Sequence, residues 1–261
     1  MINLSVAVIT LNEQENLVRC LSSLPRGCEI LVVDSGSEDK TVQIAEGFGA
    51  KVFTRKFDDF SSQKNFAIEK CKRKWVLSID ADEELNQELK SFIEDEFDTE
   101  KVDKACFRIR RNLVFNHKLM RFGKTNDRPI RLFPNSLRFK NAIHEEVDTD
   151  QLEVRKIPGS IIHYSYKDHS DYFRRFNSYT SKIAENHFMR GKKPNLLVHV
   201  VRPFFEFISR YFFRLGFLDG RNGFTYALYS SLYAYVKYEK LIEKMQMGEV
   251  NHSLKKEIVN E

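Results

Sequence analysis

Four strand-like segments, each followed by a helical pattern, occupy the first hundred residues and restrict the fold more than any other feature. In order, the segments read SVAVITL, EILVVD, AKVFTRK and KWVLSID. SVAVITL is a continuous apolar run, which is typical of a parallel strand buried on both faces. Strands that alternate strictly with helices imply right-handed crossovers and a parallel sheet. The sequence therefore predicts an α/β fold with a mostly parallel sheet flanked by helices.

Polar side chains follow the ends of these strands. They are Asn12 and Glu13, Asp34, Arg55, and Asp80 with Asp82. Ligands of open α/β sheets bind outside the carboxyl ends of the strands, so we expect a binding site at this edge. Asn12 is also expected to cap the first helix, with Glu15 as its partner three residues later. A dinucleotide site is not expected, because the first strand leads into TLNEQEN and not into a G-x-G-x-x-G turn.

The two aspartates of Asp80-Ala81-Asp82 can divide their work at a strand end. One can face a sugar hydroxyl, while the other binds Mg²⁺ or Mn²⁺ that substrate phosphates also hold. Such a cation neutralises a departing diphosphate. The alternative is that Asp82 caps a helix over residues 83–97. In both cases Glu83 and Glu84 are expected in the positively polarised first turn of that helix.

The charge of the chain is unevenly distributed. The formal net charge is +5, yet residues 101–140 contain twelve Lys or Arg against two acids. Such a block favours an anionic partner, such as a phosphorylated substrate or an anionic lipid surface, or it is a solvated face with paired charges. The four cysteines form no C-x-x-C pair, which favours a reducing compartment. Without a secretory signal pattern or a membrane-spanning run, cytoplasmic residence is expected.

Aromatic side chains are concentrated in the C-terminal third. Residues 196–240 hold thirteen of the 33 aromatics. The charged residues among them recur at four-residue spacing, at Arg202, Glu206, Arg210 and Arg214. This spacing predicts an amphipathic helix, with a turn at 216–223 before a second helix. The helix either packs on the domain or lies in a membrane interface, where Arg and aromatic side chains are favoured.

Three segments resemble the nucleotide-sugar signatures of glycosyltransferase family 2, the inverting enzymes with a GT-A fold. They are VAVITLNEQENL, ILVVDSGSEDKT and VLSIDADEEL. The later segments RPIRLFPN, NAIHEEV, IIHYSYKD and RLGFLDGRNGFTYAL resemble bacterial lipopolysaccharide-core glycosyltransferases of the β-1,4-glucosyltransferase type. Pro129 departs from this pattern, since the family commonly has Gln there.

The resemblance implies a domain arrangement and a donor site. A GT-A domain with a Rossmann-like sheet is expected over residues 1–165, with a nucleotide-sugar half at 1–100 and an acceptor half at 101–165. A helical C-terminal extension follows at 166–261. Four positions match those that hold uracil and ribose, namely Thr10, Asn12, Glu13 and Asp34, and Arg55 and Lys64 are expected near the nucleotide. Asp80 matches the ribose-side acid and Asp82 the metal-binding acid.

The residues leave some of these roles open. Asp34 directly follows ILVV, where its carboxylate can accept the imide N–H of uracil, or it only forms a turn with Ser35, Gly36 and Ser37. Inversion needs a base that deprotonates the acceptor hydroxyl. Glu145 is the first choice, although it also fits a surface acid, and Asp127 is the second.

A histidine is expected to complete the metal site. The resemblance suggests His163 as a ligand beside Asp82, with His144 as the alternative, and neutral imidazole is a competent ligand for Mn²⁺. A histidine within an apolar strand can equally be a core residue.

The sequence thus predicts a metal-dependent inverting hexosyltransferase. The expected donor is UDP-glucose, and the expected acceptor is a lipopolysaccharide inner core or a related surface glycan. The enzyme would be cytoplasmic, or peripheral on the inner membrane through residues 196–240, with no nucleic-acid partner. The alternatives are a capsule, exopolysaccharide or protein glycosyltransferase, and a nucleotide-binding module without turnover.

Overall fold

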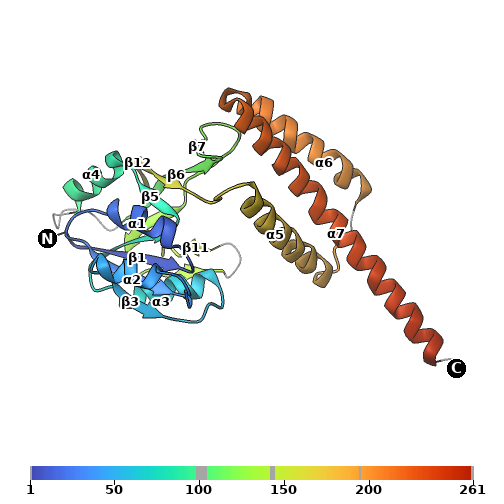
Figure 1. Cartoon of the computed structure of the whole chain (residues 1–261), viewed down its shortest axis with the longest axis horizontal. Helices are drawn as coiled ribbons and strands as arrows, with labels where there is room; N and C mark the ends of the chain where they lie inside the picture. Colours follow the sequence, from blue (N-terminus) through green and yellow to red (C-terminus); the bar gives the residue numbers. More distant parts are fainter. Residues whose placement is uncertain (1, 98–104, 142–144, 194, 260–261) are drawn as a thin grey trace. The chain divides into compact units, whose positions relative to one another are not determined.

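The computed structural model describes residues 2–97, 105–141, 145–193 and 195–259, which form two compact units. The first, here called the sheet unit, comprises residues 1–113 and 126–165. The second, here called the helical unit, comprises residues 114–125 and 166–261. Figure 1 shows the elements of both units. His144, the alternative metal ligand, lies outside the described residues.

The sheet unit is built on one mixed sheet in the order β3-β2-β1-β4-β9-β6-β12-β5. Its strands are β1 (Leu4–Thr10), β2 (Glu29–Asp34), β3 (Lys51–Thr54), β4 (Trp75–Asp80), β5 (Glu83–Leu85), β6 (Cys106–Phe115), β9 (Ile130–Pro134) and β12 (Val154–His163). Strands β1 to β4 run parallel, and β6 pairs with β12 in parallel. Because β9 is antiparallel to both β4 and β6, these two strands share one direction. The prediction of a mostly parallel sheet flanked by helices is confirmed.

Short strands complete the sheet unit and lead out of it. Strand β8 (Asn126–Asp127) pairs with β6, and β10 (Phe139–Lys140) forms an antiparallel hairpin with β11 (Glu146–Val147). Within the helical unit, strand β7 (Lys118–Leu119) pairs with Val114 and Phe115, the last two residues of β6.

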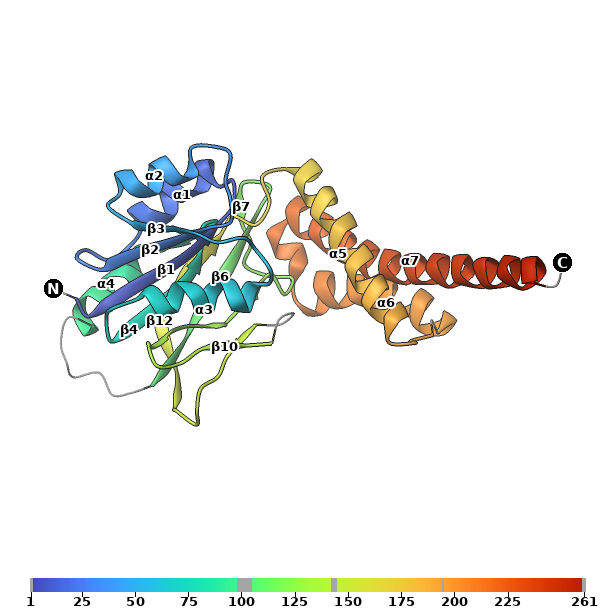
Figure 2. The ribbon, with the colours of Figure 1, turned by 90° about the horizontal axis from the view of Figure 1, so that it is seen from below.

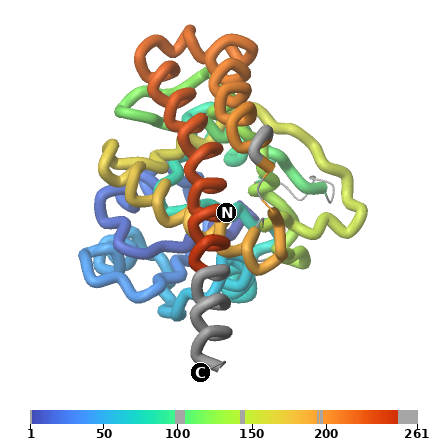
Figure 3. The backbone as a smooth tube through the Cα atoms, turned by 90° about the vertical axis from the view of Figure 1, so that its right-hand side faces the viewer, coloured from blue at the N-terminus to red at the C-terminus, as the bar shows by residue number. Residues whose placement is uncertain are grey.

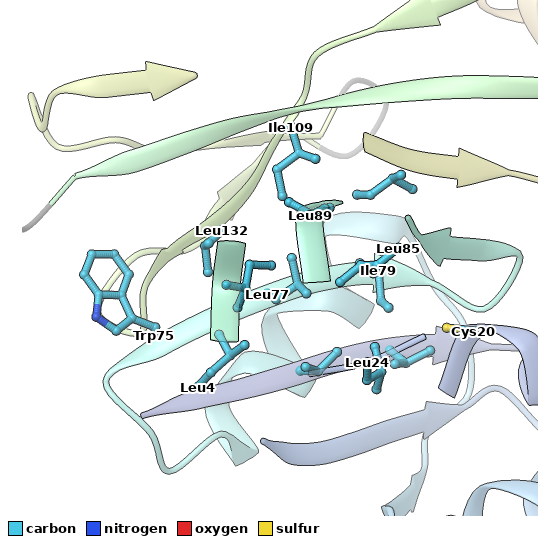
Figure 4. Packing of buried hydrophobic residues seen from close by; sticks show 14 of the residues in the cluster. Leu4, Cys20, Leu24, Trp75, Leu77, Ile79, Leu85, Leu89, Ile109 and Leu132 are labelled. Carbon is cyan, nitrogen blue, oxygen red and sulfur yellow. The ribbon is translucent and has the colours of Figure 1, made fainter. Parts of the chain in front are cut away.

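Helices cover both faces of the sheet. Helices α1 (Gln14–Ser22), α2 (Thr41–Gly47) and α4 (Gln87–Glu96) pack on one face, and α3 (Phe60–Lys70) packs on the other. Figure 2 shows α1 and α2 opposite α3 across the sheet. Figure 4 shows neighbouring strands meeting in one core cluster, where Leu4, Leu77 and Leu132 come from β1, β4 and β9. Trp75, only 2% exposed, closes this cluster with its ring against those of Phe97 and Phe107.

Two local predictions of helix starts are wrong. Glu83 and Glu84 lie in strand β5, which pairs with β12, and α4 begins only at Gln87. Asn86 is the N-cap of α4, since its side chain accepts a hydrogen bond from the Leu89 N–H at 3.0 Å. Asn12 does not cap α1, because that helix begins after Glu13 without a side-chain cap. Pairing with β12 thus outweighs the local preference of two glutamates for a helix N-terminus.

The described part of the helical unit contains three long helices. They are α5 (His169–Met189), α6 (Leu196–Ile208) and α7 (Arg221–Val259). A π-helical turn, η1 (Ser209–Phe213), and a 3₁₀ turn, η2 (Gly216–Asp219), connect α6 to α7. Figures 1 and 3 show α6 running beside the first half of α7. None of the helices in the described residues is long and apolar enough to span a bilayer.

Two glycines allow the connection to fold back tightly on α7. A Cβ atom on Gly223 would lie 1.8 Å from the carbonyl oxygen of Gly216, which is far below any contact distance. The segment that follows β7 is held by Asp219, which is 3% exposed. Its carboxylate accepts the N–H of Phe122 at 2.9 Å and that of Arg121 at 3.1 Å.

Candidate active site

The carboxyl ends of β1, β2 and β4 lie side by side at one edge of the sheet. Thr10 pairs with Asp34, and Ile9 pairs with Asp80. Thr10 is 5% exposed, and its hydroxyl makes no hydrogen bond within the part of the chain that the structure describes. The parallel register therefore brings Thr10, Asp34 and Asp80 together, with one buried hydroxyl left for a further partner.

The Asp34 carboxylate holds the turn that follows β2. Its Oδ2 atom accepts the N–H of Gly36 at 2.9 Å and that of Ser37 at 2.8 Å. Its Oδ1 atom accepts the Ser37 hydroxyl. Gly36 has φ of 100°, a backbone conformation that favours glycine. The turn considered as an alternative role is thus present, but a carboxylate with about four acceptor sites retains capacity for one more donor.

Asn12 ties the loop after β1 to the loop after β2. Its N–H donates to Ser37 Oγ at 2.8 Å, and its Oδ1 accepts the Glu38 N–H at 2.9 Å. Asn12 has a left-handed φ of 53°, which Asn tolerates better than most residues. Glu13 accepts a hydrogen bond from the Asn16 side chain at 2.8 Å. Asn12 therefore organises the two loops that border the strand-end edge.

Arg55 is held by two side chains beside the same edge. Its guanidinium donates to both oxygens of Asp58, at 2.8 and 2.7 Å, and to Gln63 Oε1. The hydrogen bonds from Arg55 lower the pKa of Asp58 to about 2. Arg55 thus has a fixed position, and its charge is already shared with a carboxylate.

Seven charged side chains form one alternating series of acid–base contacts, here called the charge chain. In order of contact they are Glu145, Lys64, Asp80, Arg131, Glu83, Arg111 and Asp127. With four carboxylates and three cations, the charge chain carries a formal charge of −1. The two residues considered as catalytic base occupy its opposite ends.

Asp80 lies between two buried cations. Arg131 Nη2 donates to Asp80 Oδ2 at 2.9 Å, and Lys64 Nζ lies 3.2 Å from Asp80 Oδ1. The second contact has ion-pair distance but not hydrogen-bond geometry, so within the described residues Oδ1 accepts no hydrogen bond. Burial would raise the pKa of Asp80, but the charges of Arg131, Lys64 and Arg111 outweigh it and hold that pKa well below its usual range. Asp80 is therefore ionised at neutral pH, and its buried Oδ1 atom has an ion-pair partner but no hydrogen-bond donor among the described residues.

Glu83 is the central acid of the charge chain. It is 1% exposed, and its Oε1 accepts from Arg131 at 2.8 Å and Arg111 at 3.1 Å. Its Oε2 accepts the backbone N–H of Asp80 at 3.0 Å. Sequence reasoning missed Glu83, Arg131 and Arg111 as parts of this site. The available signal was an arginine inside the apolar strand IRLFP, because a buried arginine requires an acidic partner.

The ends of the charge chain differ in how firmly the acid is held. Glu145 Oε1 lies 2.9 Å from Lys64 Nζ, and the Glu145 side chain is 28% exposed. Asp127 is 55% exposed and is bound by two parallel hydrogen bonds from Arg111, at 3.0 and 2.6 Å. A bidentate arginine occupies both oxygens of Asp127. Glu145 keeps one carboxylate oxygen outside its ion pair.

Asp82 faces His163 across the ends of β4 and β12. Asp82 Oδ2 lies 3.3 Å from His163 Nε2, and the two side chains are 13% and 20% exposed. The Asp82 carbonyl accepts the Tyr164 N–H at 2.9 Å, which fixes the backbone after β4 to β12. Burial lowers the pKa of His163, but its hydrogen bond to Asp82 and the negative charges of Asp82 and Glu83 raise it above the usual value.

A polar cavity of 570 Å³ opens within the sheet unit, beside β6, β9 and the β10–β11 hairpin. Its lining includes the cations Arg108, Arg111, Arg131 and Lys140. It also includes the carboxylates Asp127, Glu145 and Glu146. Both ends of the charge chain therefore border this cavity, which has the volume typical of small-molecule sites, about 300–1,000 Å³.

Residues 5–156 match the family model described as Glycosyl transferase family 2. The chain belongs to this family. An "Uncharacterized glycosyltransferase" of Rickettsia bellii is 31% identical over 260 residues, which cover 92% of this chain and 86% of the relative. The "Lipopolysaccharide core biosynthesis glycosyltransferase LpsC" of Rhizobium meliloti is 26% identical over 254 residues, 92% of each chain. These matches confirm the family resemblance expected from the sequence.

Similarity to solved structures is weaker. Residues 1–349 of S. aureus TarS, in complex with UDP-GlcNAc, share 15% identity with a TM-score of 0.45, over 94% of this chain and 92% of that one.

The residues of this family 2 glycosyltransferase fit a divalent cation in part. Asp82 Oδ2 and His163 Nε2 lie 3.3 Å apart, and an oxygen with an imidazole nitrogen is a donor pair that suits Mn²⁺. The excess negative charge of the charge chain and of Asp82 also favours a cation at this edge. Among the described residues no group of three or more His, Cys, Asp or Glu forms a complete ligand set. Substrate phosphate oxygens would therefore have to supply further ligands, as is usual for Mg²⁺ sites.

Proposed function

We propose that this family 2 glycosyltransferase transfers a hexose, glucose from UDP-glucose, with inversion to an acceptor of the lipopolysaccharide inner core. The observation that carries the proposal is the strand-end edge, where Asp80 and the Asp82–His163 pair lie at the end of β4 and Glu145 borders the adjoining cavity. The similarity to LpsC, a protein named for lipopolysaccharide core biosynthesis, supports this acceptor class. The donor assignment is supported by the three nucleotide-sugar signatures of the sequence.

On the donor side, each strand end has a role in this proposal. Asp34 accepts the imide N–H of uracil with its remaining capacity, and the buried Thr10 hydroxyl bonds the nucleoside. Asp80 binds the ribose or sugar hydroxyls through its unsatisfied oxygen. Asn12 and Glu13 shape the loop over the base. Arg55 and Lys64 lie near the nucleotide, where each is already paired with a carboxylate.

On the acceptor side, Glu145 is the base that takes the proton of the attacking hydroxyl. Lys64 fixes Glu145 from one side, and the cavity gives a sugar hydroxyl access from the other. Asp127 remains the second choice, since the bidentate contact with Arg111 has to open before Asp127 can accept a proton. A divalent cation held by Asp82 and His163 would neutralise the diphosphate leaving group as a Lewis acid.

A thermal-shift screen of nucleotide sugars, with and without Mn²⁺, tests the donor assignment. UDP-glucose should raise the Tm more in the presence of Mn²⁺ than in its absence. A response to GDP- or dTDP-sugars but not to UDP-sugars would contradict the proposal. With Asp82→Ala, hydrolysis and transfer from UDP-glucose should disappear while the variant still folds. Retained turnover in that variant would contradict the metal role of Asp82.

Two alternative assignments predict different results. A capsule, exopolysaccharide or protein glycosyltransferase would use the same donor edge with another acceptor, and a panel of acceptors separates these from a lipopolysaccharide enzyme. A nucleotide-binding module would bind UDP-sugars without hydrolysis or transfer in the unmodified protein.

We also infer that the helical unit associates with the cytoplasmic face of the inner membrane. Large apolar side chains are exposed along α6 and the α6–α7 connection: Phe204 (69%), Phe205 (59%), Phe213 (71%) and Leu218 (53%). The segment 198–224 carries four arginines against two acids, and one of these acids, Asp219, is buried. Exposed aromatics flanked by arginine suit an interface with anionic lipids.

A further inference from the structure

Among the described residues that line the 570 Å³ cavity, one arginine has no acidic partner. Arg111 and Arg131 are neutralised within the charge chain, and Lys140 Nζ lies 3.4 Å from Asp148. Arg108 is exposed, and its Nη1 donates to the carbonyl oxygen of Arg128 at 2.9 Å. A carbonyl oxygen fixes the guanidinium without cancelling its charge. Within the described residues, Arg108 makes no ion pair.

The position of Arg108 follows from the sheet. Arg108 lies on β6 opposite Ile130 of β9, and both line the cavity. On its other side it pairs with Lys156 of β12, which does not line the cavity. Pairing with a strand on each side therefore places Arg108 at the cavity wall. Its planar guanidinium suits a carboxylate or a phosphate.

We propose that this cavity binds an anionic acceptor sugar, whose carboxylate or phosphate is recognised by Arg108 while its hydroxyl reaches Glu145. This inference rests on the proposed function, because it assigns the acceptor class of the same reaction. Glu146, which also lines the cavity and is exposed, opposes an anion and limits its affinity. Arg108 and Glu146 therefore act in opposite directions on the same ligand.

Binding of three probe sugars to the full chain tests the proposal by saturation-transfer NMR. The probes are glucuronic acid, glucose 6-phosphate and glucose, each titrated with UDP and Mg²⁺ at saturation so that the diphosphate site is filled. At least one anionic sugar should bind about tenfold more tightly than glucose, which corresponds to about 1.4 kcal/mol. A preference for glucuronic acid indicates a carboxylate acceptor, and one for glucose 6-phosphate indicates a phosphorylated acceptor.

Three variants locate the effect. Arg108→Gln should lose the preference for the anionic sugar, whereas Glu146→Gln should strengthen it. Lys156→Gln removes the neighbouring exposed charge on β12 and is the matched control, which should retain the preference.

Three results would each overturn the inference. The first is equal affinity for all three sugars, and the second is the absence of a saturable signal from either anionic sugar. The third is an equal loss of the preference for the anionic sugar in Arg108→Gln and Lys156→Gln. If UDP itself fails to bind, the proposed function fails as well. If UDP binds and UDP-glucose is hydrolysed without discrimination between the sugars, only the acceptor inference fails.

Discussion

Replacing Arg131 by methionine should destabilise the sheet unit by about 3 kcal/mol at neutral pH. Arg131 is 4% exposed and binds Asp80 and Glu83 at 2.9 and 2.8 Å. Removing one partner of a buried ion pair typically costs about 3–5 kcal/mol, because a buried charge remains uncompensated. Asp80 keeps Lys64 at 3.2 Å and Glu83 keeps Arg111 at 3.1 Å, so the loss should lie at the lower end.

The loss of stability in Arg131→Met should decrease as the pH falls. The folded-state pKa of Asp80 is depressed, so its stabilising contribution is present above its unfolded pKa of about 3.9 and is lost as the pH falls through the folded value. Without the charge of Arg131, the pKa of the buried Asp80 carboxyl is less depressed, so this carboxyl accepts a proton at a higher pH than in the wild type. The difference in the free energy of unfolding between wild type and Arg131→Met should therefore be largest at about pH 7 and smaller at about pH 3.5.

Urea denaturation followed by tryptophan fluorescence measures this effect. Trp75 is the single tryptophan and is 2% exposed in the sheet-unit core, so its emission reports the unfolding of that unit. Arg155→Met is the control, because Arg155 and Glu153 pair at 2.6 Å with side chains that are 42% and 63% exposed. Exposed ion pairs contribute little, so the loss in this variant should be much smaller than in Arg131→Met. A loss below about 1 kcal/mol for Arg131→Met, or a difference from wild type that widens in acid, would refute the reasoning.

Three further predictions address the base, the helical connection and the membrane face. Glu145→Gln should lower kcat for transfer by about 100-fold or more in steady-state assays, with little change in the donor KM. Asp127→Asn should lower kcat less. A larger loss of kcat in Asp127→Asn than in Glu145→Gln would reassign the base. Gly223→Ala should destabilise the helical unit by about 1–3 kcal/mol, because the added Cβ would meet the backbone carbonyl of Gly216, which cannot move aside like a flexible side chain. Thermal circular dichroism measures this loss, and an unchanged Tm would contradict the tight contact. Phe213→Asn should weaken co-sedimentation with anionic vesicles by about tenfold. The Tm should not change, because the ring is 71% exposed in the folded protein. Unaltered vesicle binding would argue against this face as the membrane contact.

The sequence alone was sufficient to predict the strand-end edge of the sheet. Apolar runs that lack alternation identify strands buried on both faces, and strict alternation with helices makes them parallel. Parallel strands end at one edge, so Asp34 and Asp80 could be expected together before any register was known. The signatures around them were enough to recognise the family, because they combine residue type, spacing and strand position.

Only the tertiary structure decided what balances the charges at that edge. Glu83 was expected in the first turn of a helix. Residues 83–85 instead form a strand that pairs with β12, and this acid is buried. Its partner Arg131 lies 48 residues away and reaches it because β9 runs antiparallel beside β4. Local sequence patterns report the helix or strand preference of a segment and the burial of its faces. They do not report which distant strand lies beside it, and in this protein that adjacency determines which buried carboxylates are compensated.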